Sequence, residues 1–106
     1  MFVHQHFNHK LKFIKMRYEN VNLNEATIVD VREPYEFEAG NVNGSINIPL
    51  GEVPSKVEEF KNMKKPLVLC CASGNRSGQA TSFLTKQGVN EVYNGGGWNM
   101  VAVRKG

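Results

Sequence analysis

The sequence has few cysteines and no long apolar run. Its 106 residues include two cysteines, Cys70 and Cys71, which are adjacent. Adjacent cysteines cannot link distant segments, and neighbouring strand residues point to opposite faces, so a disulfide framework is excluded. No apolar stretch approaches the roughly 20 residues that a membrane-spanning helix needs, and the N-terminus lacks the apolar core of a signal peptide. We therefore expect a cytoplasmic protein with no membrane association.

Positive charge is in mild excess and is not concentrated in one place. The formal net charge is +3, from 13 Lys and Arg against 10 Asp and Glu. The sequence has no basic stripe interleaved with aromatic residues, so we expect no nucleic-acid partner. The N-terminal histidines His4, His6 and His9 have no acidic or thiol partner nearby, and we predict no metal site.

Short apolar runs alternate with amphipathic stretches along the chain. This alternation is typical of a small parallel α/β sheet, here of four to five strands, with helices on both faces. A fifth strand could form at 13–17, and Gly95–Gly97 is predicted to form a turn. We expect strands at 26–32, 45–48, 67–70 and 91–94, and helices at 34–39, 54–63, 77–87 and 98–103.

The length of the chain fits one small domain. We predict that this domain comprises residues 20–106 and that residues 1–19 form an N-terminal extension or an edge segment. We expect the protein to be a monomer or a weak dimer.

A cysteine stands where the strand at 67–70 ends and a tight loop begins. The loop amides, together with the unpaired N–H groups at the start of the next helix, would form an anion-binding concavity around Cys71. Such a setting lowers the pKa of a thiol, so Cys71 is predicted to be a nucleophile. Arg76 adds a cation that could orient an anionic substrate or pair with an acidic group. The candidate binding residues of this loop are Ala72, Ser73, Gly74, Asn75, Arg76 and Ser77.

Asp30 and Arg32 lie at the end of the first predicted strand. Because the carboxyl ends of parallel strands meet at one edge of a sheet, we expect both residues near Cys71. We expect Asp30 to make a structural hydrogen bond to the loop rather than to act as a general base. Arg32 is expected to pair with Glu36 or with another carboxylate. Cys70 continues the apolar strand, so it is expected to be buried and inert.

Three motifs, in this order, resemble the rhodanese domain family. They are VDVREPYEFEAGNVNGSINIP at 29–49, CASGNRS at 71–77 and YNGGGW at 93–98. The resemblance covers about residues 20–103. It implies the rhodanese fold, which is a parallel sheet with helices on both faces. Asn41 stands where the family commonly has a histidine.

The resemblance also implies an activity, that of a single-domain sulfurtransferase of the thiosulfate or polysulfide type. Cys71 would form a persulfide, and the backbone amides of residues 72–76 would hold the transferred sulfur. Asp30 and Arg32 would brace the site from the neighbouring strand. The implied donor is a small sulfur-containing anion, the acceptor is cyanide, a thiol or a protein thiol, and no cofactor or metal is needed.

Two other classes of function stay open. Counted from Cys70, the spacing to Arg76 is C-x5-R, which is the spacing of cysteine phosphatases and of arsenate reductases. Leu69 stands where a histidine usually precedes the phosphatase cysteine, and Gly74 has the shared spacing from Cys71, so a sulfurtransferase is favoured. The second alternative is a non-catalytic binding module with the same fold, although such modules usually lack the cysteine.

Overall fold

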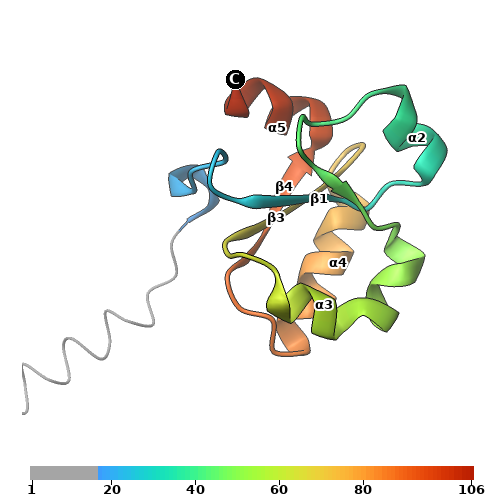
Figure 1. Ribbon diagram of the computed structural model, residues 1–106, viewed down its shortest axis with the longest axis vertical. Helices are drawn as coiled ribbons and strands as arrows, with labels where there is room; N and C mark the ends of the chain where they lie inside the picture. Colours follow the sequence, from blue (N-terminus) through green and yellow to red (C-terminus); the bar gives the residue numbers. More distant parts are fainter. Residues whose placement is uncertain (1–16) are drawn as a thin grey trace, which may run out of the picture.

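A parallel sheet forms the centre of the molecule. The computed structural model describes residues 17–106, and within this part of the chain the sheet has four strands in the order β2-β1-β3-β4. Helices surround the sheet (Figure 1), so the predicted α/β architecture is confirmed. The strand considered at 13–17 lies, apart from Arg17, outside the described residues. The strands are β1 (Thr27–Asp30), β2 (Ile46–Asn47), β3 (Leu67–Cys71) and β4 (Val92–Gly97).

The sheet divides the core into two halves. The helical segments are η1 (Tyr18–Asn20), α2 (Pro34–Ala39), η2 (Leu50–Lys56), α3 (Val57–Asn62), α4 (Asn75–Lys86) and α5 (Trp98–Lys105). Side chains of η2, α3 and α4 close one half, and side chains of η1 and α5 close the other. All five residues of β3 are buried between the halves, as expected for an inner strand of a parallel sheet.

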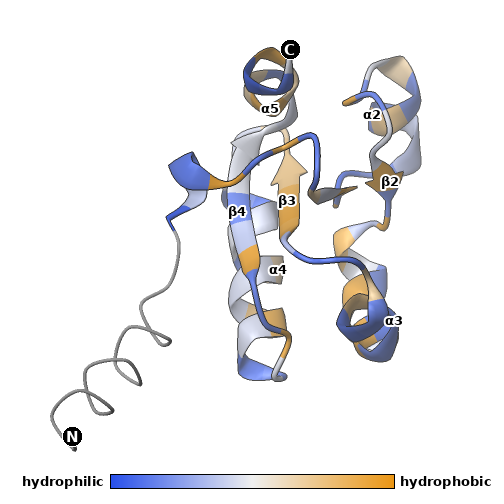
Figure 2. Cartoon of the chain, turned by 60° about the vertical axis from the view of Figure 1, so that its left-hand side comes forward, coloured by the Kyte–Doolittle hydropathy of each residue, from blue (hydrophilic) through white to orange (hydrophobic). Residues whose placement is uncertain are grey.

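The carboxyl ends of β1 and β3 lie side by side, because Asp30 pairs with Cys70 in the ladder. Figure 2 shows the arrowhead of β3 pointing to the end of the molecule where α5 and α2 stand on either side. This is the edge at which ligands bind on sheets of this kind.

Helix α2 has the predicted boundaries. Pro34 occupies its first turn, where its missing N–H costs nothing, and Gly40 follows the last helical residue. Glu33 and Glu36 form a capping box, in which the Glu36 carboxylate accepts a hydrogen bond of 3.0 Å from the Glu33 N–H. The capping box therefore fixes the direction of the Glu36 side chain.

Helix α4 begins two residues earlier than predicted, at Asn75 rather than at Ser77. The reason is the backbone of Gly74, whose φ of 100° lies in the left-handed region that glycine adopts readily. This conformation turns the chain straight into the helix, so Arg76 lies in the first helical turn and not in a loop.

The second helix also differs from the prediction of a start near Pro54. The chain coils as the 3-10 segment η2 from Leu50, and the α-helix α3 begins only at Val57. The Glu52 N–H donates to the Pro49 carbonyl at 2.8 Å, which opens this tighter coil before the proline is reached.

The predicted turn at Gly95–Gly97 is wrong, because these glycines belong to β4. Gly96 pairs with Cys70 and Gly97 with Cys71, while Gly95 is the extra residue where the register shifts. A Cβ atom on Gly95 would lie 2.7 Å from the Val68 Cγ1. Close packing against β3, and not chain reversal, therefore explains this glycine.

Candidate active site

Cys71 is the last residue of β3, and its thiol lies beneath the turn that leads into α4. The residue is 1% exposed. Its Sγ accepts hydrogen bonds from the Gly74 N–H at 3.0 Å and the Ser77 N–H at 3.4 Å, and the Ser77 hydroxyl lies 3.3 Å away. The first turn of α4 and the loop before it thus direct several donors at one sulfur atom, which is the concavity expected from the sequence.

These donors set the charge state of Cys71. Burial by itself raises the pKa of the thiol, but the Ser77 hydroxyl and the N–H groups of Ser77, Gly74 and Ser73 outweigh it, so the pKa is lowered from its ordinary value of 9.0. A lowered pKa increases the thiolate fraction near neutral pH, and the thiolate is the nucleophilic form. The site can therefore present an activated sulfur.

Cys70 has the opposite environment. It is fully buried in the half of the core that contains Val68 and Val101, away from the face occupied by Cys71. Burial, reinforced by the nearby charge of Asp30, raises the pKa of Cys70 to about 12. The expectation that Cys70 is buried is confirmed, and its thiol stays protonated at neutral pH.

Asn94 holds the loop in place, and the sequence analysis did not single it out. Its amide Nδ2 donates to the Gly74 carbonyl at 3.1 Å, and its Oδ1 accepts from the Gly96 N–H at 3.0 Å. The Oδ1 also lies 2.7 Å from the Ser77 hydroxyl oxygen, whose single proton can be donated either to Asn94 or to Cys71. Asn94 thus links β4 to both ends of the Cys71 turn. Its place directly before the triple glycine was the one signal available in the sequence.

Arg76 pairs with Glu36 of α2. The two guanidinium nitrogens donate to the two carboxylate oxygens at 2.7 and 3.0 Å, a bidentate geometry. The hydrogen bonds from Arg76 lower the pKa of Glu36 to about 2, and Glu36 in turn raises the pKa of Arg76. Two roles were considered for Arg76, and in the structure its side chain pairs with an acidic group.

Asp30 and Arg32 are each other's partners. Both Asp30 oxygens accept hydrogen bonds from the Arg32 guanidinium, at 2.7 to 3.0 Å, inside the protein. Asp30 Oδ1 also accepts the Arg32 backbone N–H at 3.0 Å. The Asp30 carboxylate thus binds Arg32 and not the loop, so the expected hydrogen bond between Asp30 and the loop is wrong. The expectation that Arg32 pairs with a carboxylate is confirmed, and the carboxylate is that of Asp30. The contact between Arg32 and Glu36 is a hydrogen bond of 3.2 Å to the Glu36 backbone carbonyl.

Arg32 nevertheless joins the elements around the site. It donates to the Gly40 carbonyl at 2.7 Å, and its guanidinium lies 4.7 Å from the centre of the Trp98 ring. Trp98 opens α5, and the residue before it, Gly97, approaches the Ala72 carbonyl so closely that a Cβ would lie 3.0 Å from that oxygen. Arg32 therefore connects β1, α2 and the start of α5 behind the loop.

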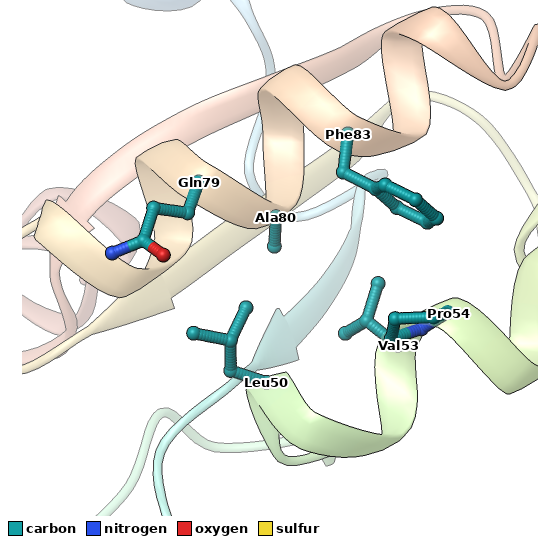
Figure 3. A pocket seen from close by; sticks show the side chains of 6 residues that line it. All are labelled: Leu50, Val53, Pro54, Gln79, Ala80 and Phe83. Atoms are coloured by element: carbon teal, nitrogen blue, oxygen red, sulfur yellow. The ribbon is translucent and has the colours of Figure 1, made fainter.

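An apolar pocket lies apart from Cys71, between η2 and α4. Figure 3 shows side chains from the two segments facing each other across it. None of its lining residues belongs to the turn at 72–74. The pocket is lined by Leu50, Val53, Pro54, Gln79, Ala80 and Phe83.

Neither metal ligands nor a membrane helix are found in the described part of the chain. Residues 17–106 contain no group of three His, Cys, Asp or Glu side chains placed to hold a metal ion. No helix among them is long and apolar enough to cross a bilayer. The histidines His4, His6 and His9 lie outside the described residues.

Comparisons with known proteins find a matching family model and similar sequences. A family model described as a rhodanese-like domain matches residues 15–102. The chain is 37% identical over 78 residues to the thiosulfate sulfurtransferase PspE of Escherichia coli, which is 73% of this chain and 75% of the relative. It is 43% identical over 70 residues to the uncharacterized protein YqhL of Bacillus subtilis, which is 66% of this chain but only 55% of the length of YqhL.

A solved structure of a rhodanese-related protein has a similar fold. The crystal structure of a rhodanese-related protein from Thermoplasma volcanium is similar to this fold with a TM-score of 0.66 and 39% sequence identity, covering 80% of this chain and 83% of that one.

Proposed function

The chain belongs to the family of rhodanese-like domains, and from this membership we propose that it is a sulfurtransferase that carries a sulfane sulfur on Cys71. One observation supports this most directly: the Cys71 Sγ lies 3.0 to 3.4 Å from two backbone N–H groups and a hydroxyl. Such donors stabilise a thiolate before the reaction and a persulfide anion after it.

The proposed reaction has two half-reactions. In the first, the Cys71 thiolate attacks the outer sulfur of a donor such as thiosulfate, the S–S bond of the donor breaks, and sulfite leaves with the bonding electrons. This gives Cys71–S–S⁻. In the second, a nucleophile such as cyanide or a thiolate attacks the terminal sulfur, and the Cys71 thiolate is released. The sulfur is carried covalently, so the proposed cycle uses neither a metal nor an organic cofactor.

The neighbouring residues have distinct proposed roles. The turn at 72–74 and the start of α4 at Asn75–Ser77 hold the terminal sulfur through their N–H groups, and Ser77 adds its hydroxyl. Asp30 and Arg32 support the site from behind through their buried pair. The proposed donor is a small sulfur-containing anion or a persulfide, and the proposed acceptor is cyanide, a thiol or a protein thiol.

The phosphatase alternative is less well supported. It requires Cys70 as the nucleophile, because only that residue has the C-x5-R spacing to Arg76. The Cys70 thiol packs in the half of the core away from the loop, and its pKa is raised rather than lowered. A buried thiol that stays protonated is a poor nucleophile.

Mass spectrometry of the intact protein tests the proposal. The protein is incubated with thiosulfate, weighed, treated with cyanide and weighed again. We expect a gain of one sulfur atom that cyanide removes, retention of this gain in Cys70→Ala, and its loss in Cys71→Ser. No gain from thiosulfate, polysulfide or an organic persulfide would refute a sulfurtransferase that acts through Cys71.

A further inference from the structure

We propose that Glu36 is a specificity-determining residue: by pairing with Arg76 it disfavours dianionic donors such as thiosulfate and favours the persulfides of small thiols. This inference rests on the proposed function, because it concerns which donor loads Cys71. It assigns a role to a carboxylate that touches neither Cys71 nor the loop backbone.

The first observation is the geometry of the pair. The Arg76 Nη1 and Nη2 each donate to one of the two Glu36 oxygens, so the carboxylate lies directly against the guanidinium. The side chains are only 33% and 22% exposed, so water screens the pair incompletely. The positive charge of the Arg76 guanidinium is therefore offset by the Glu36 carboxylate, which weakens its attraction for a second anion.

The second observation is that the carboxylate is held in place independently of Arg76. Glu36 Oε1 accepts the Glu33 N–H of the capping box at 3.0 Å, and Arg32 donates to the Glu36 carbonyl at 3.2 Å. The helix α2 that carries Glu36 is therefore fixed to the sheet edge. Because Glu36 does not have to be ordered by Arg76, the pair is pre-organised.

The third observation is the charge balance around the sulfur. Residues 72–75, between Cys71 and Arg76, are neutral. The other arginine at this edge, Arg32, is matched by the buried carboxylate of Asp30. Each of these two guanidinium groups is thus paired with one carboxylate, and the loop offers mainly its backbone dipoles to an incoming donor.

This balance affects donors according to their charge. Thiosulfate brings two negative charges to a thiolate, and with Arg32 and Arg76 both paired, their repulsion raises the energy of the encounter. A thiol persulfide, R–S–SH, brings none in its neutral form. The Cys71 thiolate attacks its outer sulfur, the S–S bond breaks, RS⁻ leaves with the electron pair, and Cys71–S–SH remains. Only one negative charge is present throughout, which the N–H groups at the start of α4 can stabilise.

The variant Glu36→Gln tests the inference. Glutamine keeps an oxygen that can accept the Glu33 N–H, so α2 stays capped, but it removes the charge that neutralises Arg76. The matched control is Glu38→Gln, since Glu38 is exposed on the same helix and makes no ion pair with any residue of 17–106. Loading of Cys71 is followed by intact mass in a single turnover, with thiosulfate or with the persulfide of 2-mercaptoethanol as donor.

We expect Glu36→Gln to raise the ratio of the thiosulfate rate constant to the persulfide rate constant by roughly five- to tenfold, because electrostatic changes act mainly on the encounter. Glu38→Gln should leave the ratio unchanged. In an Arg76→Gln background, Glu36→Gln should no longer shift the ratio, which a merely structural effect would not predict.

Three results would overturn the inference. An unchanged donor ratio in Glu36→Gln, with normal loading of the unsubstituted protein, would refute the role of Glu36 and leave the proposed function intact. An equal rise of the donor ratio in Glu38→Gln would show that the ratio depends on the total charge of α2 and not on the pairing of Glu36 with Arg76. Failure of every donor to load the unsubstituted protein would refute the proposed function and this inference together.

Discussion

Cys70 and Cys71 are consecutive residues of β3, and their thiols lie on opposite faces of the sheet, in separate halves of the core. The alternation of the strand places the two thiols in different surroundings, and these surroundings shift their pKa values in opposite directions. The pKa of Cys71 is lowered by the donors at the start of α4, whereas burial raises the pKa of Cys70 to about 12. Two thiols with the same chemistry and nearly the same position in the chain thus have different reactivities.

The first prediction concerns these two thiols. Iodoacetamide should alkylate Cys71 and not Cys70 in the native protein, because the pKa of Cys71 is lowered whereas that of Cys70 is raised. The rate should rise with pH through a pKa below 9.0. Peptide mass mapping after a time course at several pH values checks this. Modification of Cys70 before unfolding would contradict the assignment, and Cys70→Ala should leave the rate of the remaining thiol unchanged.

The second prediction concerns the Ser77 hydroxyl, which lies 3.3 Å from the Cys71 Sγ. Ser77→Ala should raise the pKa of Cys71, because the Ser77 hydroxyl is one of the hydrogen-bond donors that lower it. The pH dependence of alkylation measures this shift. Ser73→Ala is the matched control, since only the backbone N–H of Ser73 acts on the thiol. An equal pKa in Ser77→Ala and the unsubstituted protein would show that the hydroxyl donates to Asn94 alone.

The third prediction follows from the Glu36 carboxyl, whose pKa is lowered to about 2 from 4.5 by Arg76. A group with a lowered pKa in the folded state adds stability above its unfolded pKa and loses it as pH falls. Stability should therefore decline between pH 4.5 and pH 2, and this decline should be smaller in Glu36→Gln. Urea unfolding across that pH window measures both slopes. Parallel curves for the two proteins would mean that the pair adds no pH-dependent stability.

The fourth prediction concerns the buried pair of Arg32 and Asp30. Arg32→Met should cost about 3–5 kcal/mol of unfolding free energy, because it leaves a buried carboxylate without its partner. The double variant Asp30→Leu/Arg32→Met should cost less than the single one, since no charge is then stranded. Fluorescence of Trp98, the one tryptophan of the sequence, reports unfolding in both. A cost below about 1 kcal/mol for the single variant would contradict this role of the pair.

Element types followed from local patterns because they depend on neighbours in the chain. Short apolar runs predicted β1 and β3, and Pro34 and Gly40 marked the ends of α2. The prediction for the triple glycine failed because a distant contact decided its conformation. The glycines at 95–97 were expected to turn, but the pairing with β3 keeps them in a strand.

The candidate site shows the same division. The placement of Cys71 between a strand end and a helix start was evident from the sequence, as was the presence of one cation nearby. The partner of Arg76 was not evident from the sequence, since Glu36 precedes it by forty positions. Asn94 was missed for the same reason, because it reaches Gly74 and Ser77 only when β4 pairs beside β3.

The sequence by itself determined the order of strands and helices, the family, and a cysteine at the end of a buried strand. Alternating patterns and turn residues act over a few positions, so they can be recognised without coordinates. Only the tertiary structure decided which carboxylate neutralises which arginine. It also decided that Asn94 holds the loop. Those choices depend on distances between side chains on different elements, which are fixed when parallel strands align and helices pack against them.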